Sequence, residues 1–121
     1  MAKESDIGAA AEYLGSYRLI EKWLRSNRYE REYFGAPPSG DDVFLQAKLF
    51  EIRSFVSSLP NCREKLFLNC YYVRGHSVEK CAELMDISVR SAYRIKKSAL
   101  SLAASRLQGE RSGTEERSGT F

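Results

Sequence analysis

The apolar residues of this 121-residue chain recur at alternating spacings of three and four along most of its length. Such spacing places side chains on one stripe of an α-helix, whereas a half-buried strand needs a spacing of two. The chain is therefore expected to be all-α. The two longest runs are Ala10, Tyr13, Tyr17, Ile20 and Leu24, and then Leu45, Leu49, Ile52, Val56 and Leu59.

The first run predicts a helix over residues 9–31, after a flexible N-terminus at residues 1–8. The segment 34–40 contains two prolines and is expected to be a loop, because proline lacks an amide donor and restricts the residue before it. Asp41 and Asp42 suit the positive end of a second helix, which should run to about Ser58. Residues 9–58 are thus predicted to form an N-terminal hairpin of two helices.

Residues 59–108 are expected to form a three-helix domain. Asn61 to Glu64 has the form of a capping box, in which asparagine accepts a hydrogen bond from a helix amide and glutamate reaches back. Gly75 suits the end of the helix that follows. Ser77 and Ser88 suit the N-caps of the next two helices.

The last segment, residues 109–121, repeats the sequence Glu-Arg-Ser-Gly-Thr and contains almost no apolar side chain. Such a composition cannot bury a core, so the segment is expected to be a disordered tail. We assign it no function.

The segment Val78–Lys97 fits a helix-turn-helix. A small residue, Ala82, stands where the two helices must touch, and Ala92 and Ile95 supply buried positions on the second helix. The turn requires left-handed backbone, where glycine is usual. Asp86 is expected to adopt this conformation, because its short side chain can form a local hydrogen bond.

Basic charge is concentrated in the same part of the chain. The whole sequence holds 19 Lys and Arg against 16 Asp and Glu, but residues 60–108 hold 9 basic and 4 acidic residues. Within them, Ser88–Ala99 carries four basic residues and no acidic one. A concentrated basic helix is what binding to a polyanion requires, and on charge alone a solvated helix face is the alternative.

The outward side of the second helix, residues 88–99, is expected to enter the major groove of duplex DNA. Arg90 and Arg94 are neighbours on that side, and each is suited to read guanine with two hydrogen bonds. Lys96 and Lys97 suit phosphate contacts, as do Ser77 and Ser88 beside helix N-terminal amides. The candidate DNA-binding residues are Ser77, Ser88, Val89, Arg90, Ser91, Tyr93, Arg94, Lys96 and Lys97.

These features extend beyond the motif itself. They include Leu59-Pro60 followed by Arg63, an aromatic-rich stretch ending in Gly75, the pattern S-x-E-x-x-A-E-L from Ser77, and the pattern I-S-x-R-x-x-Y-R from Ile87. Over about residues 43–107 the chain resembles region 4 of sigma-70 factors, in the form found in small phage and prophage transcription regulators of the ArpU type.

The resemblance implies a DNA-binding transcription regulator with an N-terminal helical hairpin and a three-helix domain like sigma region 4. It implies that Arg90, Ser91, Tyr93, Arg94 and Lys97 contact DNA. Asp86 stands where the family has a turn glycine. No segment similar to region 2 is present, so a full sigma factor is not expected.

Three other interpretations are open. Region-4-like domains also dock on RNA polymerase, so the chain is alternatively a protein-interaction module that docks through its aromatic N-terminal helices. Trp23, Phe44, Phe50 and Phe55 are either core of the hairpin or a homodimer interface. A phage packaging subunit also pairs a helix-turn-helix with oligomerising helices, but usually places the DNA-binding part first.

An enzyme is not expected, because the sequence offers no pairing of a nucleophile with a base and no phosphate-binding loop. The cysteines Cys62, Cys70 and Cys81 and the single histidine His76 match no zinc spacing, so neither a metal nor a cofactor is expected. No run of about 18 apolar residues is present, and the N-terminus lacks a secretory pattern. The expected compartment is the cytoplasm.

Overall fold

A computed structural model of the chain describes residues 4–35, 37 and 40–120, with side chains described as far as Gly109. These residues form an all-α fold, as the apolar spacing predicts, with no strand in the described part of the chain. The elements are α1 (Glu4–Phe34), α2 (Asp41–Ser57), α3 (Arg63–Leu68), the π-helical turn η1 (Asn69–Val73), α4 (Val78–Met85) and α5 (Val89–Thr120).

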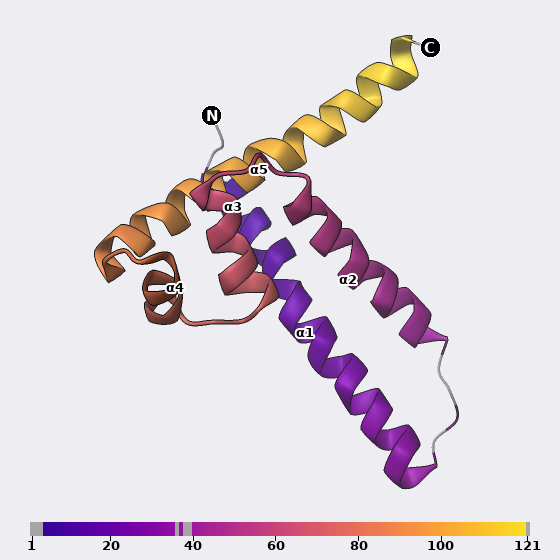
Figure 1. Cartoon of the computed structure of the whole chain (residues 1–121). Coiled ribbons are helices and arrows are strands. Elements are labelled where there is room, and N and C mark those ends of the chain that lie inside the picture. The colour runs from indigo at the N-terminus through magenta and orange to yellow at the C-terminus, as the bar shows by residue number, and fades with distance from the viewer. Residues whose placement is uncertain (1–3, 36, 38–39, 121) are drawn as a thin grey trace.

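Helix α1 starts beside α5 and extends, together with α2, away from the other helices (Figure 1). It packs along α2, which runs in the opposite direction, and on its other side against η1 and α5. Helix α5 also packs against α3 and α4. Because α1 touches neighbours on both sides, one continuous core joins the N-terminal helices to the rest of the chain.

A polar contact fixes the far end of the α1–α2 pair. The Asp42 carboxylate accepts a hydrogen bond from the Asn27 side-chain amide at 2.8 Å and forms an ion pair with Arg31. The hydrogen bond from Asn27, followed by that from Arg31, holds the pKa of Asp42 below its usual value. Asp41 and Asp42 both lie in the first turn of α2, where their charge also meets the positive end of the helix.

Helix α1 is longer than the periodicity predicts, since it begins at Glu4 and ends at Phe34. Residues 4–8, predicted to be flexible, are therefore helical. Two local features favour this start: Glu4 and Asp6 carry negative charge in the first turn, and Ile7 packs against the core. Residues 1–3 lie outside the described residues.

The π-helical turn η1 changes which residues of the third predicted helix are buried. Tyr72 is buried, whereas its neighbours Tyr71 and Val73 are only partly buried. A π-turn adds a residue to one helical turn and so rotates the positions that follow. Burial raises the pKa of Tyr72 to about 12.

The capping box predicted at Asn61 is wrong. Cys62, in extended backbone, is the N-cap of α3, and no side chain caps this helix. The Asn61 side-chain oxygen instead accepts a hydrogen bond from the Lys65 ammonium at 3.2 Å. Because α3 begins at Arg63, Asn61 lies one residue before the N-cap position that a capping box requires.

Three of the four singled-out aromatic residues are not core. Phe55 is buried and meets Tyr13 edge to face, with ring centroids 5.7 Å apart. Trp23, Phe44 and Phe50 are 54, 63 and 74 % exposed. Helix α2 is apolar around much of its circumference but packs closely along α1 on one side only, so the interpretation as hairpin core is wrong for these three residues.

The C-terminal segment also differs from its prediction. Helix α5 continues to Thr120 and so includes residues 109–120, which the composition predicts to be disordered. No proline interrupts it, and it projects away from the other helices (Figure 1). Within the described residues, no helix combines the length and apolar character needed to cross a membrane.

Candidate nucleic-acid interface

The two helices of the predicted motif pack against each other through small and apolar side chains. Cys81 and Ala82 of α4 and Ala92 and Ile95 of α5 are all buried. Ala82 and Ala92 have no side chain beyond Cβ, so the helices can approach closely. Helix α4 packs against α5 and η1, which together hold it in place.

Serine residues cap both helices, as predicted. The Ser77 hydroxyl accepts a hydrogen bond from the backbone amide of Lys80 at 3.1 Å. The Ser88 hydroxyl accepts one from the amide of Ser91 at 3.1 Å and donates to the Ser91 hydroxyl at 3.0 Å. Each cap fixes the residue at which its helix begins.

The turn between the helices has the left-handed residue that the motif requires. Asp86 has φ 56° and ψ 49°. The amide of Ile87 donates to the Ala82 carbonyl at 3.0 Å and the amide of Asp86 donates to the Glu83 carbonyl at 3.2 Å. This pair of bonds is a Schellman motif, which ends α4 and sets the direction in which α5 begins.

We expect the substitution Asp86→Gly to raise the free energy of unfolding by up to about 1 kcal/mol, because glycine adopts left-handed backbone without the steric cost that a Cβ imposes. Asp86→Ala should lower it, since alanine keeps the Cβ and loses the polar side chain. Chemical denaturation of the three proteins measures both changes. Equal stability of the glycine and alanine variants would contradict this account of the turn.

A basic face runs along the exposed side of α5. Arg90, Arg94 and Lys97 lie at spacings i, i+4 and i+7, and all three are exposed. None of them forms an ion pair or hydrogen bond with any group among the described residues. We refer to these three residues as the basic face of α5.

The other candidates on α5 are placed differently. Val89 and Tyr93 are exposed beside the basic face, and Ser91 is partly buried in its contact with Ser88. The Lys96 ammonium lies 4.7 Å from the ring centroid of Tyr71 and 3.4 Å from its hydroxyl. Lys96 therefore faces η1 rather than the solvent beside Arg94, and it is less suited to a phosphate contact than Lys97.

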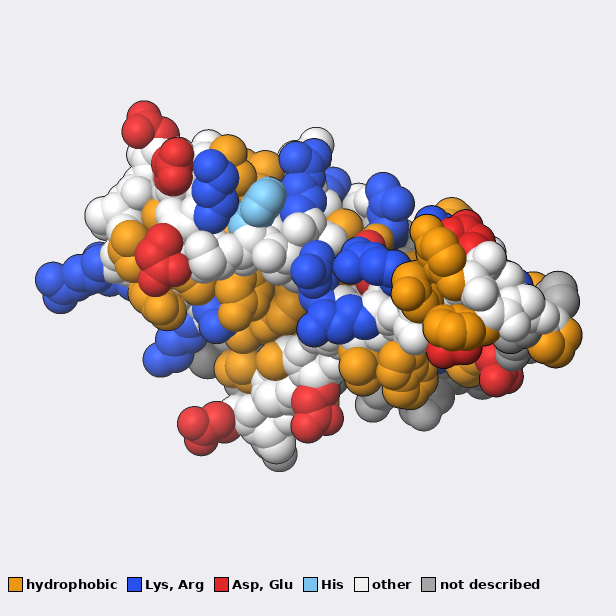
Figure 2. Space-filling view, turned by 90° about the horizontal axis from the view of Figure 1, so that it is seen from below, with side chains coloured by type: hydrophobic (Ala, Val, Ile, Leu, Met, Phe, Trp, Pro, Cys, Tyr) orange, Lys and Arg blue, Asp and Glu red, His pale blue; other side chains and the backbone are white. Residues whose placement is uncertain are grey.

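Basic side chains that the motif did not include lie next to this unit. Arg74, Gly75 and His76 form the turn between η1 and α4, and Arg18 of α1 reaches it, donating to the Arg74 carbonyl at 3.4 Å. Figure 2 shows the histidine with Lys and Arg side chains on both sides of it. Charge over residues 1–59 is balanced, with 8 basic and 9 acidic residues, so a count of charges does not single out Arg18.

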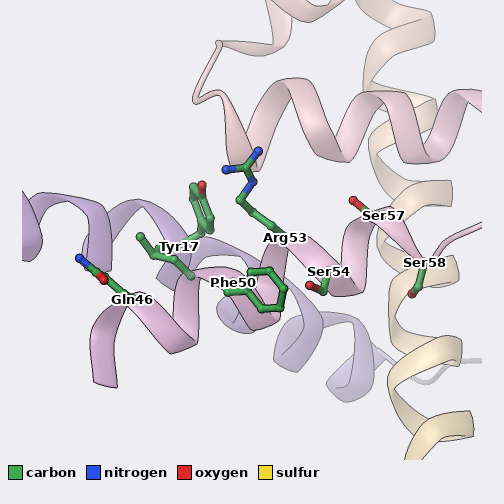
Figure 3. A pocket seen from close by; sticks show the side chains of 8 residues that line it. Tyr17, Gln46, Phe50, Arg53, Ser54, Ser57 and Ser58 are labelled. Atoms are coloured by element: carbon green, nitrogen blue, oxygen red, sulfur yellow. The ribbon is translucent and has the colours of Figure 1, made fainter. Parts of the chain in front are cut away.

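A shallow groove of about 780 Å³ lies along α2 (Figure 3). The Tyr17 hydroxyl lies next to the Arg53 guanidinium, and the ring of Phe50 also lines the groove. Burial, and then Glu21, raise the pKa of Tyr17. The lining residues are Tyr17, Gln46, Leu49, Phe50, Arg53, Ser54, Ser57 and Ser58.

The groove offers no arrangement typical of catalysis. Its serines have no histidine or carboxylate beside them in the lining, and the Ser58 hydroxyl donates to the Phe55 carbonyl at 2.6 Å. Cys70 and Cys81 are buried and unpaired, and burial raises the pKa of the Cys81 thiol, which disfavours the reactive thiolate. Among the described residues no His, Cys, Asp and Glu side chains group as metal ligands.

Comparison of the chain with family models, with curated proteins and with solved structures finds no match. The case for a nucleic-acid interface therefore depends on the geometry of α4 and α5. That geometry is a closely packed pair of short and long helices with a fixed turn, which presents three unpaired cations at helical spacing on an exposed side.

Proposed function

We propose that this protein is a DNA-binding transcription regulator of the phage or prophage type, with residues 88–99 of α5 as the recognition helix in the major groove. Under this proposal α4 and α5 are a helix-turn-helix within a domain like sigma-70 region 4, and the protein works in the cytoplasm on double-stranded DNA. Arg90 and Arg94 read bases, and Lys97 contacts phosphate.

One observation carries the proposal. Arg90, Arg94 and Lys97 are exposed on one side of α5, and none is neutralised by a described acidic group. Uncompensated like charges at helical spacing repel one another by a few tenths of a kcal/mol per pair. A solvated helix face would carry this cost without any compensating contact, whereas an anionic partner offsets the repulsion and releases counterions.

The substitution Arg94→Ala tests the proposal. Sequences bound by the wild-type protein are first selected from a random duplex pool, and affinities are then measured by gel shift. We expect Arg94→Ala to weaken binding to the selected sequence by about 5-fold to 150-fold, the value of 1 to 3 kcal/mol for a two-bond contact to guanine. Preference at one base position should also be lost.

The matched control is Lys48→Ala on α2, whose ammonium lies 3.9 Å from Glu51 and outside the basic face of α5. It removes the same charge and should leave the selected sequence and its affinity nearly unchanged. A pool that yields no preferred sequence would count against base reading. A loss equal on all sequences would make Arg94 a phosphate contact.

The exposed aromatic residues favour a second candidate function, docking on RNA polymerase without sequence-specific DNA binding. Trp23 and Phe44 line a groove of about 470 Å³ with Asn27, Asp41 and Leu45. An exposed apolar groove with a polar rim is typical of a protein-binding site. The same surface is the one through which a homodimer would form.

Capture by core RNA polymerase separates these alternatives when it is compared between the wild type and Trp23→Ala. Polymerase capture that Trp23→Ala abolishes, with no gel shift on any duplex, supports the docking module. Sedimentation of the free protein measures its oligomeric state. A dimer that forms through the groove of Trp23 and Phe44 should dissociate in the Trp23→Ala variant. Docking and DNA binding together are compatible with a transcription activator.

A further inference from the structure

The exposed side of α1 carries basic residues at the same spacing as α5. Arg18, Lys22 and Arg25 lie at i, i+4 and i+7, and all are exposed. We refer to these three residues as the basic stripe of α1. The one acidic partner recorded for the stripe among the described residues is Glu21, 3.6 Å from Arg18.

Arg18 fixes the direction in which the stripe faces. Its guanidinium packs over Gly75 and donates to the Arg74 carbonyl at 3.4 Å, so this side of α1 meets the turn that leads into α4. Lys22 and Arg25 follow on the same side, where α1 continues past that turn (Figure 1). The stripe therefore starts at the candidate interface and extends away from it.

The stripe and the candidate interface are close enough for one duplex to touch both. Arg74 and Ser77 are three peptide units apart, which is at most about 11 Å, or a third of a helical turn of DNA. Arg18 to Arg25 adds seven residues of helix, about 10 Å. Basic side chains lie on both sides of His76 in one view (Figure 2).

On this basis we propose that the basic stripe of α1 binds the phosphate backbone of DNA flanking the site read by α5. The inference rests on the proposed function and enlarges it, because it makes the N-terminal helices part of the DNA-binding surface. Lys22 and Arg25 form no ion pair with a described group, as expected of side chains whose partner is a separate polyanion. Duplex DNA is preferred over an acidic protein because the stripe is continuous with the candidate DNA interface.

The test uses the full chain and two duplexes that share one central sequence, about 12 and about 30 base pairs long, so that the longer one adds nearly one helical turn of DNA at each side. The wild type should bind the longer duplex more tightly, with a steeper dependence of log K on log salt. The double variant Lys22→Gln/Arg25→Gln should lose this advantage, its slope on the longer duplex becoming shallower by about 1 to 2. Arg18 is left in place so that its contact with the turn is retained.

The control is Lys48→Gln/Arg63→Gln, which removes two exposed positive charges from α2 and the first turn of α3. Equal helicity and thermal stability of the two double variants confirm that both are folded. Equal salt slopes for the two double variants would overturn the inference, and so would wild-type binding that does not depend on duplex length. Either result would mean that the basic stripe of α1 binds a protein partner instead of DNA. Failure of the wild type to bind either duplex would instead overturn the proposed function.

Discussion

Phe67→Ala is expected to lower the free energy of unfolding by about 3 to 5 kcal/mol, a large part of the total stability of a domain of this size. Phe67 is fully buried, and its ring stacks on Tyr71 with centroids 5.5 Å apart. Its loss removes apolar burial and leaves a cavity where α3 meets α5, which the helices cannot close. Urea denaturation followed by circular dichroism measures the change.

Phe50→Ala is the matched control, since it removes the same side chain from a position that is 74 % exposed. We expect a change within about 0.5 kcal/mol, as is usual for surface positions. If Phe50→Ala were as destabilising as Phe67→Ala, Phe50 would be buried in solution, for which a second copy of the chain is the direct explanation. Measuring stability at several protein concentrations distinguishes this case, because a dimer becomes more stable as concentration rises.

The helices and their caps are predictable from sequence because they depend on neighbouring residues. A serine hydroxyl that bonds an amide three residues ahead needs no other part of the fold, so Ser77 and Ser88 cap where predicted. Asp86 takes the left-handed turn for the same local reason. The local rule fails at Asn61, because α3 begins one residue later than predicted and Cys62 takes the N-cap position.

Burial is less predictable because it depends on what packs against each helix. Leu14 is fully buried although it lies off the first apolar run, since α1 packs against α2 on one side and against η1 and α5 on another. Conversely, α2 packs mainly along α1, and Phe44 and Phe50 stay exposed despite their apolar character. Within the π-turn η1, Tyr72 is buried while its neighbours Tyr71 and Val73 are only partly buried.

The same distinction applies to the candidate site. Helical spacing predicts that Arg90 and Arg94 share an exposed side, and both are exposed. Lys96 is next to Lys97 in sequence, but its ammonium lies over the ring of Tyr71. The spacing along α5 alone cannot predict this contact, because Tyr71 belongs to another element. A charge count does not reveal the basic stripe of α1, because 8 basic and 9 acidic residues balance over residues 1–59 and differ only in the side of the helix on which they lie.

Gly75→Ala is expected to lower the free energy of unfolding by about 1 to 2 kcal/mol, most of it the cost of left-handed backbone. Two costs combine at this position. The backbone has φ 75°, which costs any residue with a Cβ about 1 to 2 kcal/mol. A Cβ on Gly75 would also overlap the guanidinium of Arg18, and this flexible, half-exposed side chain can move aside at the loss of its contact with the turn.

A double-mutant cycle with Arg18→Ala separates these costs. In the Arg18→Ala background, Gly75→Ala should show only the backbone cost, so the two substitutions together should be less destabilising than the sum of their separate effects. Additive effects would mean that Arg18 moves away from Gly75 without loss, and that α1 is not held to this turn. Because the basic stripe of α1 is oriented by this contact, coupling between Gly75 and Arg18 is also what a DNA-binding surface shared by α1, α4 and α5 requires.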